Sequence, residues 1–208
     1  MRSFLIKKIY PVWKTKYSTL LKKRRLDFIN KIFEEKLLDQ TWLKNKNILE
    51  IGCANGKDFI QFFKDCHDVH ITGVDITDYE IDQNNVTFLK LDAENLPFED
   101  NHFDLCVSIG VFEHIQPIEK LCNLISEVER VSKSYVIIVP SISTFFEPHA
   151  GEFLWQIKPA GKKKIYSRLN YYSDEAWLQF QGFNKANIKR FSYIPFFIKN
   201  TIIYKLEY

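Results

Sequence analysis

The sequence has no long apolar run. Its apolar stretches are short and interrupted by charged residues, whereas a membrane-spanning helix needs about 20 consecutive apolar residues. Residues 1–10 are basic but lack the apolar segment and the small-residue cleavage site of a secretory signal. We therefore expect a cytoplasmic protein.

Cysteine is scarce, and its spacing excludes a zinc site. The four cysteines, at positions 53, 66, 106 and 122, form no Cys-x-x-Cys pair. We expect reduced thiols that have structural roles. Cys53 lies in a glycine turn that requires a small residue, and we interpret it as a packing residue rather than a reactive thiol.

The sequence also lacks repeats, low-complexity segments and any linker that would divide it. Apolar residues make up 46% of the 208 residues and aromatic residues 15%, which argues against disorder and is enough for one hydrophobic core. We expect a single domain over residues 1–208. Its residues 1–40 should form a basic N-terminal segment with an amphipathic helix from Trp13 onward.

Positive charge is concentrated at two places. Residues 1–31 hold ten Lys or Arg and one acid, and residues 158–199 hold nine and two. Residues 32–157 hold nine basic and 22 acidic residues. The basic segments attract anionic partners, such as phosphorylated small molecules, nucleic acid or an anionic membrane surface. The alternative is that these lysines only solvate exposed faces.

Strands and helices alternate through the middle of the chain. Apolar patterns predict strands at 47–51, 70–75, 86–91, 103–108 and 135–139, helices at 57–66 and 117–131, a helix capped by Ser173, and closing strands at 187–194 and 201–208. This alternation indicates an α/β fold with a Rossmann-like, doubly wound, mostly parallel seven-stranded sheet.

Residues 48–56 predict a ligand site. They read Ile-Leu-Glu-Ile-Gly-Cys-Ala-Asn-Gly, a short apolar strand followed by a glycine turn before a helix. Gly52 and Gly56 let the backbone approach a ligand where a side chain would collide with it. Asp75 follows 19 residues after Gly56, at the spacing of an acid that accepts hydrogen bonds from two ribose hydroxyls.

The same turn argues against a dinucleotide. The third glycine of the Gly-x-Gly-x-x-Gly pattern is missing. Glu50, two residues before Gly52, would repel a pyrophosphate and suits a cationic ligand.

With these residues in view, the chain resembles the class I S-adenosylmethionine-dependent methyltransferases, in the group that includes ubiquinone and menaquinone biosynthesis enzymes. The resemblance covers residues 45–140, through the turn, Asp75, the segment Leu91–Asp104 and Phe112-Glu113-His114-Ile115. It implies S-adenosylmethionine as the cofactor. The cofactor-binding residues that it implies are Glu50, Gly52, Cys53, Ala54, Gly56, Asp75, Ile76, Asp92, Ala93, Ser108 and Ile109.

Two positions depart from the family pattern. Ala54 stands where the family has its middle glycine. Alanine is the smallest replacement, so we expect binding to survive with a narrower turn. Gly110 stands three positions before the Glu-His pair, where related O-methyltransferases carry an acid that helps to hold a divalent cation. We therefore predict no metal.

Two histidines are candidate catalytic bases. His114 lies in the segment that the resemblance places over the methyl donor, and His149 follows the fifth strand. His114 is alternatively a packing or cofactor-contact residue. The resemblance implies that residues 141–172, which contain aromatic residues and Lys162-Lys163-Lys164, form a lid over the substrate. The alternative is that these aromatic residues are core.

We expect methyl transfer to an oxygen atom of a small-molecule, glycan-linked or lipid-linked acceptor, which can carry an anionic group. One rival is a nucleic-acid methyltransferase that uses the basic segments to hold phosphates. The segment Ser108-Ile-Gly-Val lacks the Asn/Asp-Pro-Pro-aromatic motif common in base-modifying enzymes. The other rival is a non-catalytic binding protein of the same fold. Residues 1–31 are also a candidate for peripheral membrane contact.

Overall fold

The computed structural model describes residues 29–30, 38–39, 41–56, 59–63, 66, 68–147, 152–153, 155–157, 169–194 and 198–207. The chain divides into two compact units, Met1–Gln40 and Thr41–Tyr208. In the first unit, Ile29 and Asn30 are helical. The rest of the predicted N-terminal helix lies outside the described residues, as do His149 and Lys162–Lys164.

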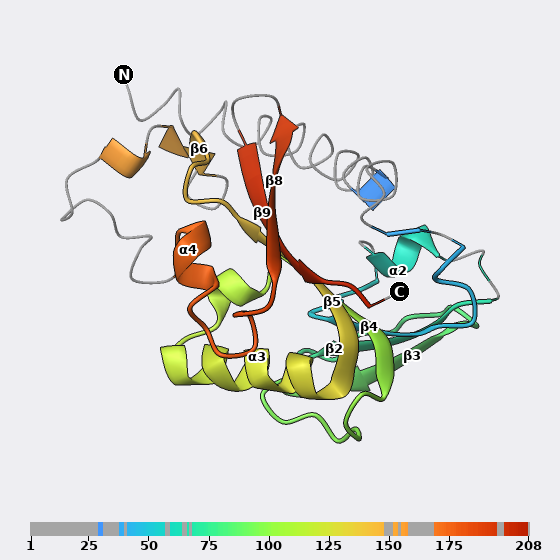
Figure 1. Cartoon of the computed structure of the whole chain (residues 1–208). Coiled ribbons are helices and arrows are strands. Elements are labelled where there is room, and N and C mark those ends of the chain that lie inside the picture. The colour runs from blue at the N-terminus through green and yellow to red at the C-terminus, as the bar shows by residue number, and fades with distance from the viewer. Residues whose placement is uncertain are drawn as a thin grey trace. The chain divides into compact units, whose positions relative to one another are not determined.

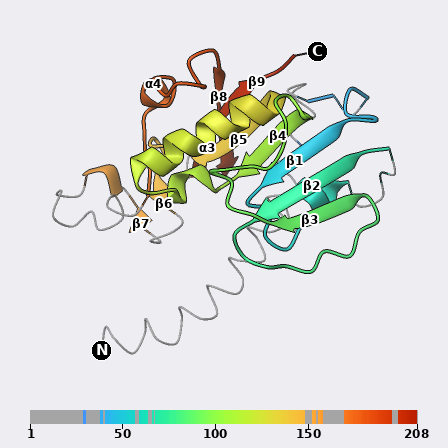
Figure 2. The ribbon, with the colours of Figure 1, turned by 90° about the horizontal axis from the view of Figure 1, so that it is seen from below.

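Seven strands of the second unit form one sheet in the order β3-β2-β1-β4-β5-β9-β8 (Figures 1 and 2). Their bounds are β1 Asn47–Ile51, β2 His70–Asp75, β3 Val86–Lys90, β4 Phe103–Ile109, β5 Ser132–Pro140, β8 Asn187–Ile194 and β9 Ile198–Lys205. Strands β1 to β5 pair in parallel, and β9 is antiparallel to both β5 and β8. This arrangement confirms the predicted fold class.

The remaining described elements are short, except for one helix. They are α2 Phe59–Phe62, η1 Phe112–His114, α3 Ile118–Val131, β6 Phe146–Glu147, β7 Glu152–Phe153, η2 Trp155–Ile157 and α4 Asp174–Trp177. Ser173 caps α4 as predicted, since its side chain accepts a hydrogen bond from the Ala176 amide. Strands β6 and β7 pair as a small separate sheet within the predicted lid.

The core lies between the sheet and α3. Leu121, Leu124, Ile125, Val128 and Val131 form the buried stripe of α3, because they recur at helical spacing. They pack in one cluster with alternate residues of the central strands, which point to the same face of the sheet. Figure 2 shows α3 lying along β4 and β5, and Figure 1 shows α2 on the opposite side of the sheet.

The strand order creates a crevice at the carboxyl end of the sheet. From β1 the chain passes to β2 and β3 on one side, and then returns to β4 and β5 on the other. Loops that follow β1 and β4 therefore lead away from each other, which is where open α/β sheets bind ligands. None of the helices in the described part of the chain has the length and apolar character to cross a bilayer.

Candidate active site

The glycine turn after β1 is fixed by hydrogen bonds to β2. The backbone amides of Gly52 and Cys53 both donate to the Val74 carbonyl, at 2.8 and 3.2 Å. Gly52 has a φ of 71°, and a Cβ atom added to it would lie 2.2 Å from Cγ2 of Val111. Only glycine fits this position, because both the left-handed backbone and the close approach of the loop after β4 exclude a side chain.

Asp75 ends β2 with its carboxylate held in one orientation. One carboxylate oxygen, Oδ2, accepts a hydrogen bond from the Ala54 amide at 3.0 Å, and Oδ1 accepts one from the Thr77 amide at 2.9 Å. Each carboxylate oxygen has a second lone pair. The side chain can therefore accept further hydrogen bonds from a ligand while the two amides keep it in place.

Glu50 lies buried at the end of β1. Its side chain is 2% exposed, and Oε2 accepts a hydrogen bond from the Ile60 amide of α2 at 3.0 Å. Glu50 therefore joins β1 to α2 and does not line the cavity described below. Ser108 is likewise buried, and its hydroxyl donates to the Ile51 carbonyl at 3.0 Å, which joins β4 to β1.

Cys53 is buried under the turn, as the packing interpretation predicted. Its side chain is 2% exposed. Burial, together with the nearby carboxylates of Glu50 and Asp75, raises the pKa of the thiol to about 12. The thiol is therefore protonated at neutral pH and is a poor nucleophile.

The loop after β3 places a second carboxylate at the crevice. Oδ1 of Asp92 accepts a hydrogen bond from the Glu94 amide at 3.1 Å. Two residues of helix α3 form hydrogen bonds with this loop. Lys120 donates to Glu94 at 2.5 Å, and Glu127 accepts a hydrogen bond from the Leu96 amide at 2.7 Å. The orientation of Asp92 thus depends on a helix that follows it by more than 20 residues.

The short helix η1 carries His114 to the other end of the crevice. The His114 amide donates to the Val111 carbonyl at 2.8 Å, and the imidazole side chain is 46% exposed. Its Nε2 lies 3.8 Å from Oε1 of Glu113, whose side chain is 2% exposed. The imidazole is accessible to a ligand.

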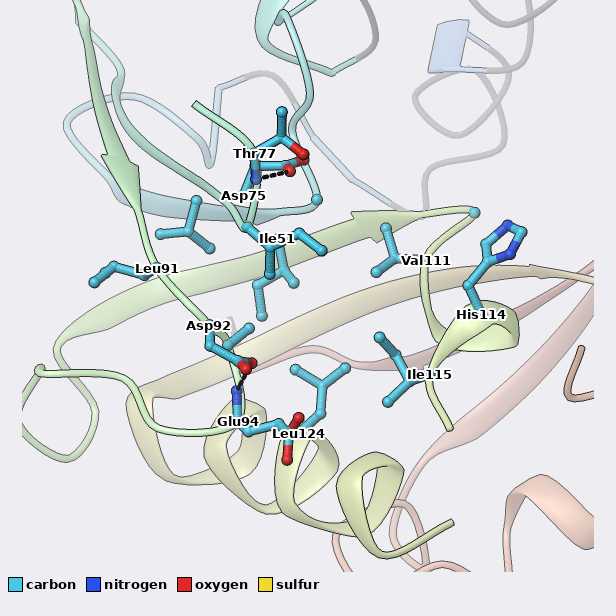
Figure 3. A pocket seen from close by; sticks show the side chains of 15 residues that line it. Ile51, Asp75, Thr77, Leu91, Asp92, Glu94, Val111, His114, Ile115 and Leu124 are labelled. Atoms are coloured by element: carbon cyan, nitrogen blue, oxygen red, sulfur yellow. Dashed lines mark hydrogen bonds between the residues drawn. The ribbon is translucent and has the colours of Figure 1, made fainter. Parts of the chain in front are cut away.

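These side chains surround one cavity of about 400 Å³, within the usual range of about 300–1,000 Å³ for small-molecule sites. Figure 3 shows Asp75 and Asp92 at one part of it and His114 at the other. The lining residues are Ile51, Gly52, Val74, Asp75, Ile76, Thr77, Leu91, Asp92, Ala93, Glu94, Gly110, Val111, His114, Ile115 and Leu124.

The predicted residues divide into two groups at this cavity. Gly52, Asp75, Ile76, Asp92, Ala93 and His114 line it, whereas Glu50, Cys53, Ala54, Gly56, Ser108 and Ile109 do not. The apolar lining from Leu91, Val111, Ile115 and Leu124 was not predicted from the sequence. Leu91 adjoins Asp92 and Ile115 adjoins His114, and this adjacency was a usable signal. Leu124 comes from α3, and only the packing of that helix shows its place.

The comparisons with known proteins agree with this geometry. Residues 49–139, from β1 to β5, match the family described as "Methyltransferase domain". Residues 49–139 are therefore similar to a methyltransferase domain. The chain is 29% identical over 140 residues to norajmaline N-methyltransferase of Rauvolfia serpentina, with 62% of this chain and 46% of the relative covered. It is 27% identical to an uncharacterised protein of Methanocaldococcus jannaschii, with 80% of this chain and 79% of that protein covered.

Among solved structures, magnesium protoporphyrin IX methyltransferase of Synechocystis PCC 6803 superposes with a TM-score of 0.60 at 15% identity. This match covers 90% of this chain and 84% of that one, and it shows a shared fold. The chain spans less than half the length of the plant methyltransferases that it matches. It covers 46% of the length of one of them and 35% of the length of another. The methyltransferase domain is the part that they share.

S-adenosylmethionine is the cofactor of this family, and the residues at the cavity fit it. The carboxylates of Asp75 and Asp92 are acceptors for hydroxyl and amino groups. Among the residues that the structure describes, the lining includes a third carboxylate, from Glu94, and no lysine or arginine. These described residues therefore favour a cation such as a sulfonium. Gly52 provides backbone without a side chain where the turn meets the cavity.

Proposed function

We propose that the chain transfers a methyl group from S-adenosylmethionine to an oxygen atom of a small-molecule, glycan-linked or lipid-linked acceptor. The observation that carries the proposal is the single cavity, which has the fixed carboxylates of Asp75 and Asp92 in one part and the exposed imidazole of His114 in the other. Such a cavity holds a donor and leaves room for an acceptor beside it.

In this proposal, Asp75 accepts hydrogen bonds from the two ribose hydroxyls, and Asp92 and Ala93 contact the adenine. Ile76, whose side chain is 72% exposed, would also contact the adenine ring. Gly52 allows the methionine part to approach the backbone. When bound, the cofactor supplies a methyl group on a sulfonium, which is electrophilic without a metal ion. The chain's own residues then position and deprotonate the acceptor.

His114 is the proposed base. His114 would take the proton of the acceptor hydroxyl while that oxygen receives the methyl group that the cofactor would supply, which would give a methyl ether and S-adenosylhomocysteine. The apolar side chains of Val111, Ile115 and Leu124 beside His114 exclude water from the reacting atoms. His149, the second candidate, lies outside the described residues and stays a prediction.

The acceptor class has separate support. The aromatic and lysine-rich composition of residues 141–172 suits an acceptor with an apolar or sugar face and an anionic group. The basic residues 1–31 extend the proposal to peripheral contact with an anionic membrane, where a lipid-linked acceptor would lie. Norajmaline N-methyltransferase is named for transfer to nitrogen, so the acceptor atom must be read from the product.

Calorimetry with S-adenosylmethionine tests the donor. We expect micromolar binding, and no heat of binding up to millimolar concentration would overturn the proposal.

A labelling experiment tests the acceptor. A lysate incubated with methyl-labelled cofactor is divided into organic-soluble, polysaccharide and nucleic-acid fractions. Label in the first two supports the proposal, and label only in a nuclease-sensitive fraction contradicts it.

The base is tested by His114→Gln, with His70→Gln as the matched control. His70 is exposed at the start of β2, at the opposite end of that strand from Asp75. We expect His114→Gln to keep cofactor affinity and to lose at least tenfold in transfer rate. Equal rates in the two variants would show that His114 is not the base.

A further inference from the structure

Asn170 joins two distant parts of the second unit. Its side chain is buried, with 6% exposure. The backbone amide donates to the Glu113 carbonyl at 2.7 Å. The side-chain amide Nδ2 donates to the Phe112 carbonyl at 3.0 Å and to the Ile115 carbonyl at 2.6 Å. One residue thus donates to three carbonyls of the turn that carries His114.

The η1 turn is too short to be stable by itself. It has three residues, and its internal backbone hydrogen bonds run from the His114 amide to the Val111 carbonyl and from the Ile115 amide to the Phe112 carbonyl, the second at 3.4 Å. A turn of this length is not stable by itself in water. Asn170 adds three hydrogen bonds from another segment to the two internal hydrogen bonds of the turn.

Asn170 is itself held firmly. Its neighbours Leu169 and Tyr171 are each 7% exposed and form a small apolar cluster with Ile142. Ile142 lies two residues after the end of β5, near the start of the predicted lid, and Asn170 lies near the end of that lid. Both ends of residues 141–172 therefore meet beside the turn that bears His114.

We propose that Asn170 is a positioning residue that fixes the η1 turn and thereby directs the His114 imidazole to the open part of the cavity. The proposal rests on the function proposed above.

The test uses Asn170→Asp, which keeps the size of the side chain and removes its donors. Asn85→Asp is the matched control. Asn85 is also a buried amide, 8% exposed, and its Nδ2 donates to the Phe63 and Cys66 carbonyls at 3.0 and 2.9 Å. Both variants place a carboxylate against two carbonyls, but only the first variant touches η1.

Two measurements on the cofactor-free protein report on the turn. Hydrogen exchange of the His114 and Ile115 amides should be at least about tenfold faster in Asn170→Asp than in Asn85→Asp. The reason is that the variant loses the two hydrogen bonds from Nδ2 of Asn170 to the Phe112 and Ile115 carbonyls, which support the turn. The His114 ring signals in NMR spectra should shift or broaden in Asn170→Asp and keep their wild-type positions in the control. Equal effects in both variants would show general destabilisation and would overturn the proposal.

If Asn170→Asp does not fold, Asn170→Ser replaces it, since a single hydroxyl can reach only one of the two carbonyls and should give an intermediate effect. No change in exchange or ring signals in a folded variant overturns the proposal. Affinity for S-adenosylhomocysteine should change less than threefold, whereas label transfer to the lysate fraction should fall at least tenfold. Absence of cofactor binding in the wild-type protein would overturn only the proposed function, because exchange and NMR need no cofactor.

Discussion

The Asp75 carboxylate accepts a hydrogen bond from the Ala54 amide at 3.0 Å. This contact ties the end of β2 to the turn that follows β1, so one side chain both shapes the turn and faces the cavity. The Thr77 amide holds the other oxygen at 2.9 Å. The two amides neutralise part of the negative charge and leave the remaining lone pairs for a ligand.

We expect Asp75→Ala to weaken S-adenosylhomocysteine binding by about 100-fold or more. Each hydrogen bond to a charged group contributes about 1.5–3 kcal/mol, and the proposed ribose contacts number two. Calorimetry of the variant gives the affinity, and Asp78→Ala, a change at an exposed loop acid outside the cavity lining, is the control. Retained affinity in Asp75→Ala would contradict the ribose assignment.

Ala54 has a φ of 45°, in the left-handed region that costs most residues free energy. We expect Ala54→Gly to raise the free energy of unfolding by about 0.5–1 kcal/mol, since glycine relieves this strain but gains entropy in the unfolded chain. Urea unfolding measures the change. The opposite substitution, Gly52→Ala, should destabilise the protein because its Cβ atom would collide with Val111. A loss of stability in Ala54→Gly would mean that the alanine side chain has a packing role.

Much of the fold was predictable because short-range patterns determine it. The apolar runs that become β1 to β5 lie in the sequence where the structure has strands, and β2 has the predicted bounds. The strand at 135–139 is longer in the structure, Ser132–Pro140, because β4 and β9 pair with residues beyond the apolar run. Pairing partners distant in sequence cannot be seen in a local pattern.

The site was only partly predictable, for the same physical reason. Asp75 and Asp92 were found because acids at strand ends meet at one edge of a parallel sheet. The cavity side of Leu124 depends on how α3 packs, and the part played by Asn170 depends on contacts with residues more than 50 positions away. Glu50 was predicted to bind the cofactor, and this stays a prediction; the hydrogen bond of its Oε2 atom with the Ile60 amide depends on where α2 packs, which the sequence does not show.

Arg130 fixes the loop that carries Asp92. Its guanidinium donates to the Leu96 and Phe98 carbonyls at 2.9 and 2.6 Å and to the Glu127 carboxylate at 2.8 Å. We expect Arg130→Lys to lower the free energy of unfolding by about 1–2 kcal/mol, because one ammonium cannot serve several acceptors in a planar fork. Urea unfolding measures the loss of stability, and we expect weaker cofactor binding to accompany that loss.

The control for this change is Lys133→Ala. Lys133 forms an ion pair with Asp104 at 3.0 Å, and its side chain is 50% exposed. Exposed pairs contribute little, so the expected change is within about 0.5 kcal/mol. Similar losses in the two variants would show that Arg130 acts only as a surface charge.

The cysteines should differ sharply in reactivity. Cys122 is exposed, whereas Cys53 and Cys106 are buried and burial raises the pKa of both thiols. Iodoacetamide at pH 8 should therefore label Cys122 in the folded protein and leave Cys53 and Cys106 unmodified until denaturant is added. Mass spectrometry of peptides identifies the sites. Rapid labelling of Cys53 in the folded state would contradict its packing role.

The buried thiols should also make the protein less stable in alkali. The pKa of Cys53 is raised from 9.0 to about 12, chiefly by burial. Between these values the folded state keeps the proton and the unfolded state loses it, so stability is fully present below about pH 9 and falls as pH rises toward 12. One such group gives a slope of at most about 1.4 kcal/mol per pH unit. Cys53→Ala should reduce the slope between pH 9 and 10.5 in urea unfolding, and Cys122→Ala, a change at an exposed cysteine, should leave it unchanged. Equal slopes in the two variants would show that the Cys53 thiol already ionises in the folded protein.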